Sequence, residues 1–181
     1  MLVLTGASHT GKTAVANRLL ETLPPPAAFL SVDDVLSRVL RRASGQIWSH
    51  IPLAYEILTA ELGPLLGKGW FVIVESTFTY VSPTGEGEFH AEALERLVAA
   101  AEECSAPAFV AQLSAPENVV LKRAERAGRL DKSIVSRTVA LHKSIELPLD
   151  PYLVDAGRLD PEQSADKILR WLRAETSSQA N

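Results

Sequence analysis

The clearest chemistry in this sequence lies near its start, in a segment with the spacing G-x-x-x-x-G-K-[ST]. Glycines at these positions let the backbone fold into a concavity whose N–H groups point at phosphate oxygens, and a helix that begins at Lys12 adds its positive end. The lysine would reach the β- and γ-phosphates of a nucleotide, while the hydroxyl of Thr13 would hold Mg²⁺. The expected phosphate-binding loop consists of Gly6, Ala7, Ser8, His9, Thr10, Gly11, Lys12 and Thr13.

The binding motif ends at Thr13, and no binding role is assigned to position 14. The residue there is Ala14, which we expect to belong to the apolar pattern of the helix, together with Val15, Leu19 and Leu20.

Acidic residues follow two further apolar runs of the chain. Asp33 and Asp34 come after the run 27–32. Because the carboxyl ends of parallel strands meet at one edge of a sheet, we expect an acidic side chain from this pair to face the phosphate loop. A carboxylate there could take the proton of a substrate hydroxyl during attack on a γ-phosphate, and Asp33 is the predicted base. Asp34 could face inward instead, and either residue could cap the helix that follows.

Glu75 ends the apolar run 70–74 and is predicted to orient Mg²⁺ directly or through water. The hydroxyls of Ser76 and Thr77 could contact the same coordination shell. The alternative is a carboxylate that faces solvent at the end of a strand.

The segment from Lys122 to Lys143 is basic, although the whole chain carries a formal charge of −4. The segment contains seven basic residues and two acidic ones, which indicates a site for a small anion or a solvated helix face. Arg123 and Arg126 are three residues apart and share a helix face, with Arg129 next along it. These arginines could neutralise the charge that develops on a transferred phosphoryl group. The overall acidity argues against a general nucleic-acid binder.

The rest of the chain must position these groups. Strands alternate with helix-like patterns, which predicts an α/β fold with a parallel sheet and helices on both faces. The segment 78–89 is expected to be a loop, and 174–181 a disordered tail. The expected strands are 2–4, 27–32, 70–74, 108–113 and 152–154, and the expected helices begin near Lys12, Val35, Ile51, Ala91, Pro116 and Asp160.

With 181 residues and 46% hydrophobic content, the chain fits one domain, residues 1–173. No apolar run is long enough to cross a bilayer, and the first strand leaves no room for a leader, so we expect a cytoplasmic protein without a membrane partner. Cys104 is expected to be a buried or half-buried structural thiol. The four histidines are too dispersed to predict a metal site.

Several rings lie near the expected ends of the second and third strands. They could line a pocket for the molecule that accepts the phosphate, or they could pack in the core. These residues are Trp48, His50, Tyr55, Phe78, Tyr80 and Phe89.

Together, the phosphate loop, the carboxylates at Asp33 and Glu75, and the basic segment resemble the small P-loop kinases of the nucleoside-monophosphate-kinase-like group. The pattern is most similar to chloramphenicol phosphotransferases, polynucleotide kinases and zeta-toxin type kinases, which phosphorylate a hydroxyl. The resemblance spans nearly the whole chain. It implies a P-loop NTPase fold with a five-stranded sheet of order 2-3-1-4-5, a helical lid at about 122–143, and a nucleotide base bordered by 155–159.

In that family, the acid that matches Asp33 takes the hydroxyl proton, and the arginines that match Arg123 and Arg126 form a mobile lid over the phosphates. Two features depart from the pattern. Polynucleotide kinases of this type place an arginine a few residues after the acid, whereas the nearest arginine here is Arg38. The carboxylate at the third strand is more often aspartate than glutamate.

The sequence thus predicts a Mg·ATP-dependent kinase that phosphorylates a hydroxyl of a small molecule such as an antibiotic, a nucleoside or a sugar-like metabolite. The alternatives are a polynucleotide or nucleotide kinase and a non-catalytic nucleotide-binding switch. The predicted catalytic residues are Lys12, Asp33, Arg123 and Arg126; ATP would bind Arg123 and the phosphate loop, and Mg²⁺ would bind Thr13 and Glu75. Neither the acceptor nor the oligomeric state follows from the sequence.

Overall fold

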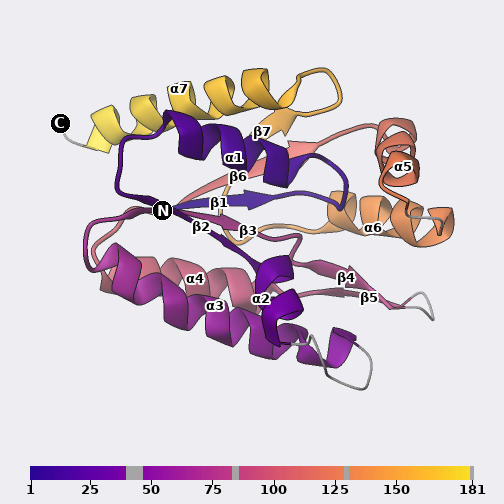
Figure 1. Cartoon of the computed structure of the whole chain (residues 1–181), viewed down its shortest axis with the longest axis horizontal. Helices are drawn as coiled ribbons and strands as arrows, with labels where there is room; N and C mark the ends of the chain where they lie inside the picture. Colours follow the sequence, from indigo (N-terminus) through magenta and orange to yellow (C-terminus); the bar gives the residue numbers. More distant parts are fainter. Residues whose placement is uncertain (40–46, 83–85, 129–130, 180–181) are drawn as a thin grey trace.

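A parallel sheet of five strands forms the centre of the molecule, as drawn in Figure 1. The structure is a computed structural model that describes residues 1–39, 47–82, 86–128 and 131–179. The strands lie in the order β2-β3-β1-β6-β7, which is 2-3-1-4-5 when the strands of this sheet alone are numbered, and confirms the predicted order. The strands are β1 (Leu2–Thr5), β2 (Ala27–Ser31), β3 (Phe71–Glu75), β6 (Phe109–Ser114) and β7 (Tyr152–Asp155).

Helices cover both faces of the sheet because the central strands are apolar on both sides. In β1, Leu2 and Leu4 pack toward one face, and Val3 packs toward the other. One face is covered by α1 (Lys12–Thr22) and α7 (Pro161–Gln179), and the other by α3 (Ile51–Leu66) and α4 (Ala91–Glu103).

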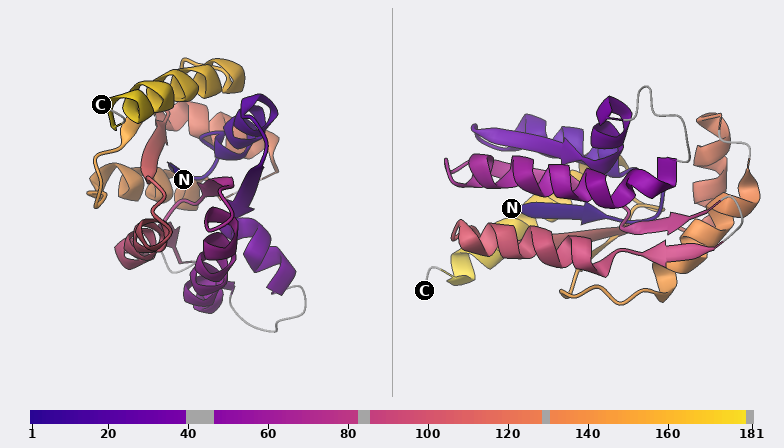
Figure 2. Two further views of the ribbon diagram at one scale, coloured as in Figure 1. Left: turned by 90° about the vertical axis from the view of Figure 1, so that its left-hand side faces the viewer. Right: turned by 90° about the horizontal axis from the view of Figure 1, so that it is seen from below.

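The carboxyl ends of the strands carry the remaining elements. The chain passes from β1 through the phosphate loop into α1, and from β2 directly into α2 (Val32–Val39). Two further helices, α5 (Glu117–Arg126) and α6 (Lys132–Ser144), lie at this same end of the molecule, as the right view of Figure 2 shows. A short 3₁₀ helix, η1 (Ile47–His50), precedes α3.

The prediction of a loop over 78–89 is wrong for half of this segment, and residues 83–85 lie outside the described part of the structure. Residues Thr79–Val81 (β4) and Gly87–Phe89 (β5) form an antiparallel hairpin. Its strands have three residues each and belong to a separate small sheet, so they leave little local pattern. The hairpin packs against α6, where a side chain at Gly87 would come within 2.9 Å of Leu141. This support comes from a distant part of the chain, which local patterns do not reveal.

Two other boundaries differ from the prediction. The basic segment forms two helices, because Asp131 caps the start of α6 by accepting hydrogen bonds from the backbone N–H of Ser133 and Ile134. The expectation of a disordered tail over 174–181 is also wrong as far as Gln179, where α7 ends, and residues 180–181 lie outside the described part of the structure. The polar hydroxyls near its end bond to carbonyls one turn back, as Ser177 does to Arg173, so the polar side chains do not interrupt the helix.

In the part of the chain that the structure describes, no helix has both the length and the apolar character needed to span a membrane.

Candidate active site

The phosphate loop has the backbone that its glycines predict. Gly6 has φ +147° and Gly11 has φ +103°, both in the region that side chains disfavour. A Cβ atom at Gly6 would lie 2.4 Å from the carbonyl oxygen of Leu113 in β6, so this position has no room for a side chain. The loop therefore lies directly against the neighbouring strand.

Lys12 folds over the loop that precedes it. Its Nζ donates hydrogen bonds to the carbonyl oxygens of Gly6 at 2.9 Å and Ala7 at 3.1 Å, and the side chain is buried. Burial lowers the pKa of Lys12, while the negative charges of Glu75 and Asp33 raise it. The ammonium thus lies where the motif places it, within the field of two carboxylates.

The two predicted magnesium ligands are in contact. The hydroxyl of Thr13 donates a hydrogen bond to Oε1 of Glu75 at 2.8 Å. Burial raises the pKa of Glu75, whereas Lys12 and the hydrogen bonds from Thr13 and Ser31 lower it. Ser31 pairs with Glu75 in the register of β2 and β3, so the sheet itself aligns these groups.

Position 14 adds no ligand to this pair. The residue there is alanine, whose methyl group can hold neither a metal ion nor a phosphate. Ala14 is exposed on α1, so the expectation that it belongs to the apolar face of this helix is corrected. That face is formed by Val15, Ala16 and Leu19, which are buried.

The oxygens of Thr13 and Glu75 have the chemistry that Mg²⁺ prefers. Among the described residues, no three His, Cys, Asp or Glu side chains gather into a metal site of their own. A magnesium ion at Thr13 and Glu75 would therefore take its other ligands from water and from nucleotide phosphates, as is usual for this ion.

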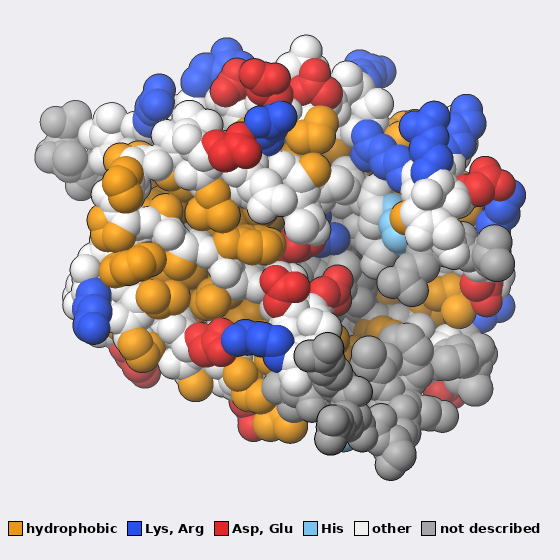
Figure 3. All heavy atoms as spheres, viewed as in Figure 1, with side chains coloured by type: hydrophobic (Ala, Val, Ile, Leu, Met, Phe, Trp, Pro, Cys, Tyr) orange, Lys and Arg blue, Asp and Glu red, His pale blue; other side chains and the backbone are white. Residues whose placement is uncertain are grey.

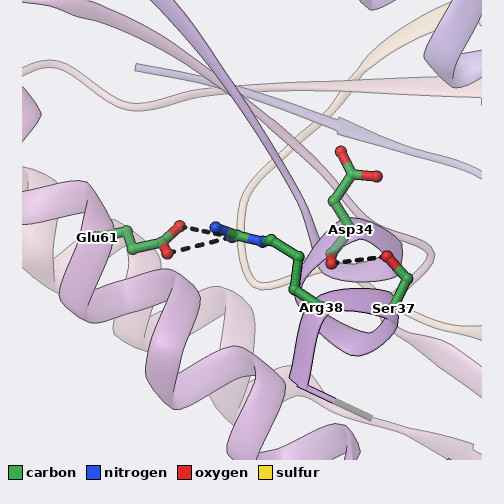
Figure 4. Close-up of polar contacts among 4 residues, drawn as sticks. All are labelled: Asp34, Ser37, Arg38 and Glu61. Atoms are coloured by element: carbon green, nitrogen blue, oxygen red, sulfur yellow. Dashed lines mark hydrogen bonds and ion pairs between the residues drawn. The ribbon is translucent and has the colours of Figure 1, made fainter. Parts of the chain in front are cut away.

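Asp33 and Asp34 occupy the first turn of α2, where both are exposed. The charge of Asp33 acts on the ammonium of Lys12, on the carboxylate of Glu75 and on the hydroxyl of Tyr55, so it lies within reach of the loop. Asp34 accepts a hydrogen bond at its backbone oxygen from Ser37 at 2.9 Å, and Figure 4 shows its carboxylate directed away from the neighbouring helix α3.

The basic helix α5 contacts the phosphate loop through Arg123. Its Nη1 donates to the carbonyl oxygen of Thr10 at 2.9 Å, and its Nη2 donates to that of Ala156, after β7, at 2.8 Å. Arg126 is exposed, and Arg129 lies outside the described residues. In Figure 3, a hollow separates basic side chains over α5 from acidic side chains over α2.

Arg38, the arginine nearest to the acidic pair in the sequence, is bound elsewhere. Its Nη2 donates to both carboxylate oxygens of Glu61 in α3, at 3.1 and 3.2 Å (Figure 4). The guanidinium is therefore turned toward α3.

Two of the rings considered for the acceptor pocket belong to the core instead. Tyr55 and Phe78 are buried, and their rings stack with centroids 5.5 Å apart. The hydroxyl of Tyr55 lies 2.7 Å from that of Ser76, which also accepts a hydrogen bond from the backbone N–H of Phe78. His50, Tyr80 and Phe89 are half-buried, and the side chain of Trp48 lies outside the described part of the structure. Cys104 is half-buried, as expected.

Sequence reasoning gave no role to His142, which the structure places at the base of the phosphate loop. It is buried in α6, with Nε2 3.2 Å from Oγ1 of Thr5 and Nδ1 3.1 Å from Nε2 of Gln112. Burial, and then the charge of Lys12, lowers the pKa of His142 to about 4. The sequence contains no motif that signals this contact.

The geometry agrees with a comparison against protein families. The chain matches the model of the AAA_33 family, an AAA domain, over residues 1–144. The chain belongs to this family. Among curated proteins, none matches it.

Three solved structures share the fold over nearly the full length of both chains. The tunicamycin resistance protein of Deinococcus radiodurans is 19% identical, with a TM-score of 0.68, and the match covers 94% of each chain. The APS kinase of Mycobacterium tuberculosis, solved with AMPPNP and APS, is 18% identical with a TM-score of 0.67, covering 95% of this chain and 96% of that one. A sugar kinase from Janibacter sp. HTCC2649 is 18% identical with a TM-score of 0.64, covering 95% and 93%. The protein therefore has the P-loop kinase fold, which confirms the resemblance at this level.

Proposed function

We propose that this protein is a Mg·ATP-dependent kinase that transfers the γ-phosphate to a hydroxyl group of a small molecule. The observation that carries the proposal is the geometry of the phosphate loop: Lys12 is buried over it, Thr13 contacts Glu75, and Asp33 lies in the first turn of the helix that follows the neighbouring strand β2. A carboxylate beside the group that grips the last phosphate is where the proton of an attacking hydroxyl must be received.

The donor side of the reaction is assigned to the phosphate loop. Its backbone N–H groups and Lys12 would hold the β- and γ-phosphates, while Thr13 and Glu75 would hold Mg²⁺. When bound, Mg²⁺ neutralises part of the phosphate charge and aligns the γ-phosphate for in-line attack. The hydrogen bond of 2.8 Å from Thr13 to Glu75 supports the assignment of both side chains to one Mg²⁺ site.

Arg123 and Arg126 are assigned to the lid. Arg123 uses two of its N–H groups on carbonyl oxygens, and the guanidinium retains further donors for phosphate oxygens. Its bond to Ala156 also brings α5 against the segment 155–159, beside which we place the nucleotide base. Arg126, exposed on the same helix, could approach the γ-phosphate from the open side of the hollow.

A small-molecule acceptor is favoured over a polynucleotide end by the state of Arg38. Polynucleotide kinases of this type carry an arginine after the catalytic acid, and here that candidate is paired with Glu61 instead. The acidic balance of the chain points in the same direction, because a strand of nucleic acid needs a basic groove. The tunicamycin resistance protein and the sugar kinase, which share the fold, bear names of this small-molecule kind.

Two adjacent aspartates provide a matched test of the proposed base. We expect Asp33→Asn to reduce kcat for phosphate transfer by about 10²- to 10⁴-fold, because general base catalysis is lost. The affinity for Mg·AMPPNP should change little, since the phosphate loop is intact. Asp34→Asn removes the same charge one residue away and should keep near-normal kcat.

The measurement is transfer of labelled γ-phosphate to a panel of nucleosides, sugars, hydroxylated antibiotics and 5′-hydroxyl oligonucleotides. Transfer to oligonucleotides alone would contradict the small-molecule assignment. Equal kcat values for Asp33→Asn and the wild type, with the acceptor identified from the panel, would show that Asp33 is not the base.

A further inference from the structure

His142 lies where three elements, α6, β1 and β6, meet beside the candidate active site. It belongs to α6, and its ring is buried between Thr5 at the end of β1 and Gln112 in β6. Thr5 immediately precedes Gly6, the first residue of the phosphate loop. Its hydroxyl lies 3.5 Å from the carbonyl oxygen of Thr77, two residues beyond Glu75. The ring thus contacts the supports of the loop rather than the loop itself.

The chemistry of the partners gives this contact a direction. The amide nitrogen of Gln112 can only donate, so Nδ1 of His142 accepts. The proton of the neutral ring is then on Nε2, which donates to Oγ1 of Thr5. The hydroxyl of Thr5 is left to donate to the carbonyl oxygen of Thr77. With Nε2 of Gln112 facing Nδ1, each group in the chain donates to the next, and the ring accepts at Nδ1 in its neutral form.

The lid helices are attached to the phosphate loop at both of its ends. Arg123 in α5 bonds to the carbonyl oxygen of Thr10 near the end of the loop, and His142 in α6 bonds to Thr5 just before its start. Beyond these two attachments, α5 and α6 carry exposed basic side chains such as Arg126 and Lys132. An apolar cluster that includes Ala7 of the loop, Val120 of α5 and Val139 of α6 packs the two helices against the loop, and the two attachments add directional contacts to this packing.

We propose that His142 is a positioning residue for phosphoryl transfer. Its imidazole fixes the position of the lid helix α6 relative to β1, the strand that leads into the phosphate loop. The inference rests on the proposed function. His142 does not touch the reacting atoms. Its loss would leave phosphate binding by the loop in place and would misalign the lid, which acts on the transferred group.

Three variants test this assignment. His142→Phe keeps a planar ring and removes both nitrogen atoms, and His142→Gln retains an N–H donor that can reach Thr5. Thr5→Val removes the hydroxyl and keeps the branched shape of the side chain. Thermal melting of each variant reports whether it folds. The readouts are calorimetric affinity for Mg·AMPPNP and the kcat and KM of ATP hydrolysis with water as the acceptor.

We expect His142→Phe and Thr5→Val each to lower kcat by at least about tenfold, because a small displacement of the lid helices moves their basic side chains away from the transferred phosphate and slows the reaction. Affinity for Mg·AMPPNP should stay within about threefold of the wild type, since the loop amides and Lys12 remain. His142→Gln should restore most of kcat. The double variant of His142→Phe and Thr5→Val should be no slower than either single variant, because both break one chain of contacts.

Additive losses in the double variant, or equal losses in His142→Gln and His142→Phe, would overturn the proposal and leave His142 with a packing role only. Unchanged kcat in a folded His142→Phe variant would do the same. If the wild type binds no Mg·AMPPNP, the proposed function and this inference both fail. If the wild type binds Mg·AMPPNP and His142→Phe has the same kcat as the wild type, only this inference fails.

A spectroscopic measurement needs no nucleotide. The ¹⁵N shifts of the imidazole of His142, identified by their loss in His142→Gln, report which ring nitrogen carries the proton. We expect a proton on Nε2 and none on Nδ1 at pH 7. A proton on Nδ1 would contradict the directed chain from Gln112 to Thr77.

Discussion

At the scale of single residues, the candidate site depends on a glycine as much as on its charged groups. We predict that Gly6→Ala destabilises the protein by about 2 kcal/mol or more, because its φ of +147° and the carbonyl of Leu113 leave no place for a methyl group. The same change should abolish binding of Mg·AMPPNP, since the loop amides would be displaced. Thermal melting and calorimetry check the two effects.

Gly63 in α3 is a control for this substitution. A Cβ atom there meets nothing within 4 Å beyond its chain neighbours, and the backbone is helical. Gly63→Ala should therefore leave nucleotide binding unchanged, and its effect on stability should stay within about 1 kcal/mol, because the gain in helix propensity is opposed by contact of the new Cβ with the ring of Pro64. A melting temperature of Gly6→Ala equal to that of the wild type would show that the loop is not constrained in the way described.

Residue types and spacing predict the donor half of the candidate site. Lys12 and Thr13 follow from the motif, and the structure places Thr13 against Glu75 as the common sheet edge requires. The choice between Asp33 and Asp34 does not follow from the sequence, because the two residues are adjacent and both belong to the first turn of α2. His142 could not be predicted, since its partners are 137 and 30 residues away.

At the scale of secondary structure, long apolar patterns predicted the five strands of the sheet and the helices that cover it. Short or polar elements escaped this reasoning. The hairpin of β4 and β5 is supported by α6, and the end of α7 is helical despite its polar side chains. Local hydrophobicity predicts which residues are buried. It therefore predicts neither an exposed helix end nor three-residue strands that a helix distant in the sequence supports.

The attachment of α6 predicts a pH dependence of stability. The pKa of His142 is lowered from 6.5 to about 4 in the folded protein, by burial and by the charge of Lys12. Between these values the unfolded chain binds a proton that the folded chain does not, so stability falls as the pH decreases. The contribution of His142 is complete above pH 6.5 and should decline by on the order of 3 kcal/mol toward pH 4.

Urea denaturation of the wild type and of His142→Gln at several pH values isolates this contribution. Glutamine does not titrate, and the other ionisable groups are common to both proteins. The difference in free energy of unfolding should shift against the wild type as the pH falls from 7 to 4. A difference that stays constant over this range would show that the ring is protonated equally in the folded and unfolded chains.

At the scale of the whole molecule, the strand order assembles the site. Because β3 lies between β2 and β1, the elements that follow these strands meet at one edge, although Lys12, Asp33 and Glu75 are far apart in the sequence. Helices α5 and α6 lie at this same end of the sheet (Figure 2). The fold thus brings the phosphate loop, the acidic first turn of α2 and the basic helix α5 to the same end of the molecule, and Figure 3 shows a hollow between the acidic and basic side chains.

The most direct test of this account is calorimetric titration of the protein with AMPPNP in the presence and absence of Mg²⁺. We predict magnesium-dependent binding by the wild type, its loss in Lys12→Met, and its retention in Lys68→Met, which removes an exposed lysine far from the loop in sequence. A wild type that binds no nucleoside triphosphate with magnesium, or a Lys12→Met variant that binds as tightly as the wild type, would contradict the central claim.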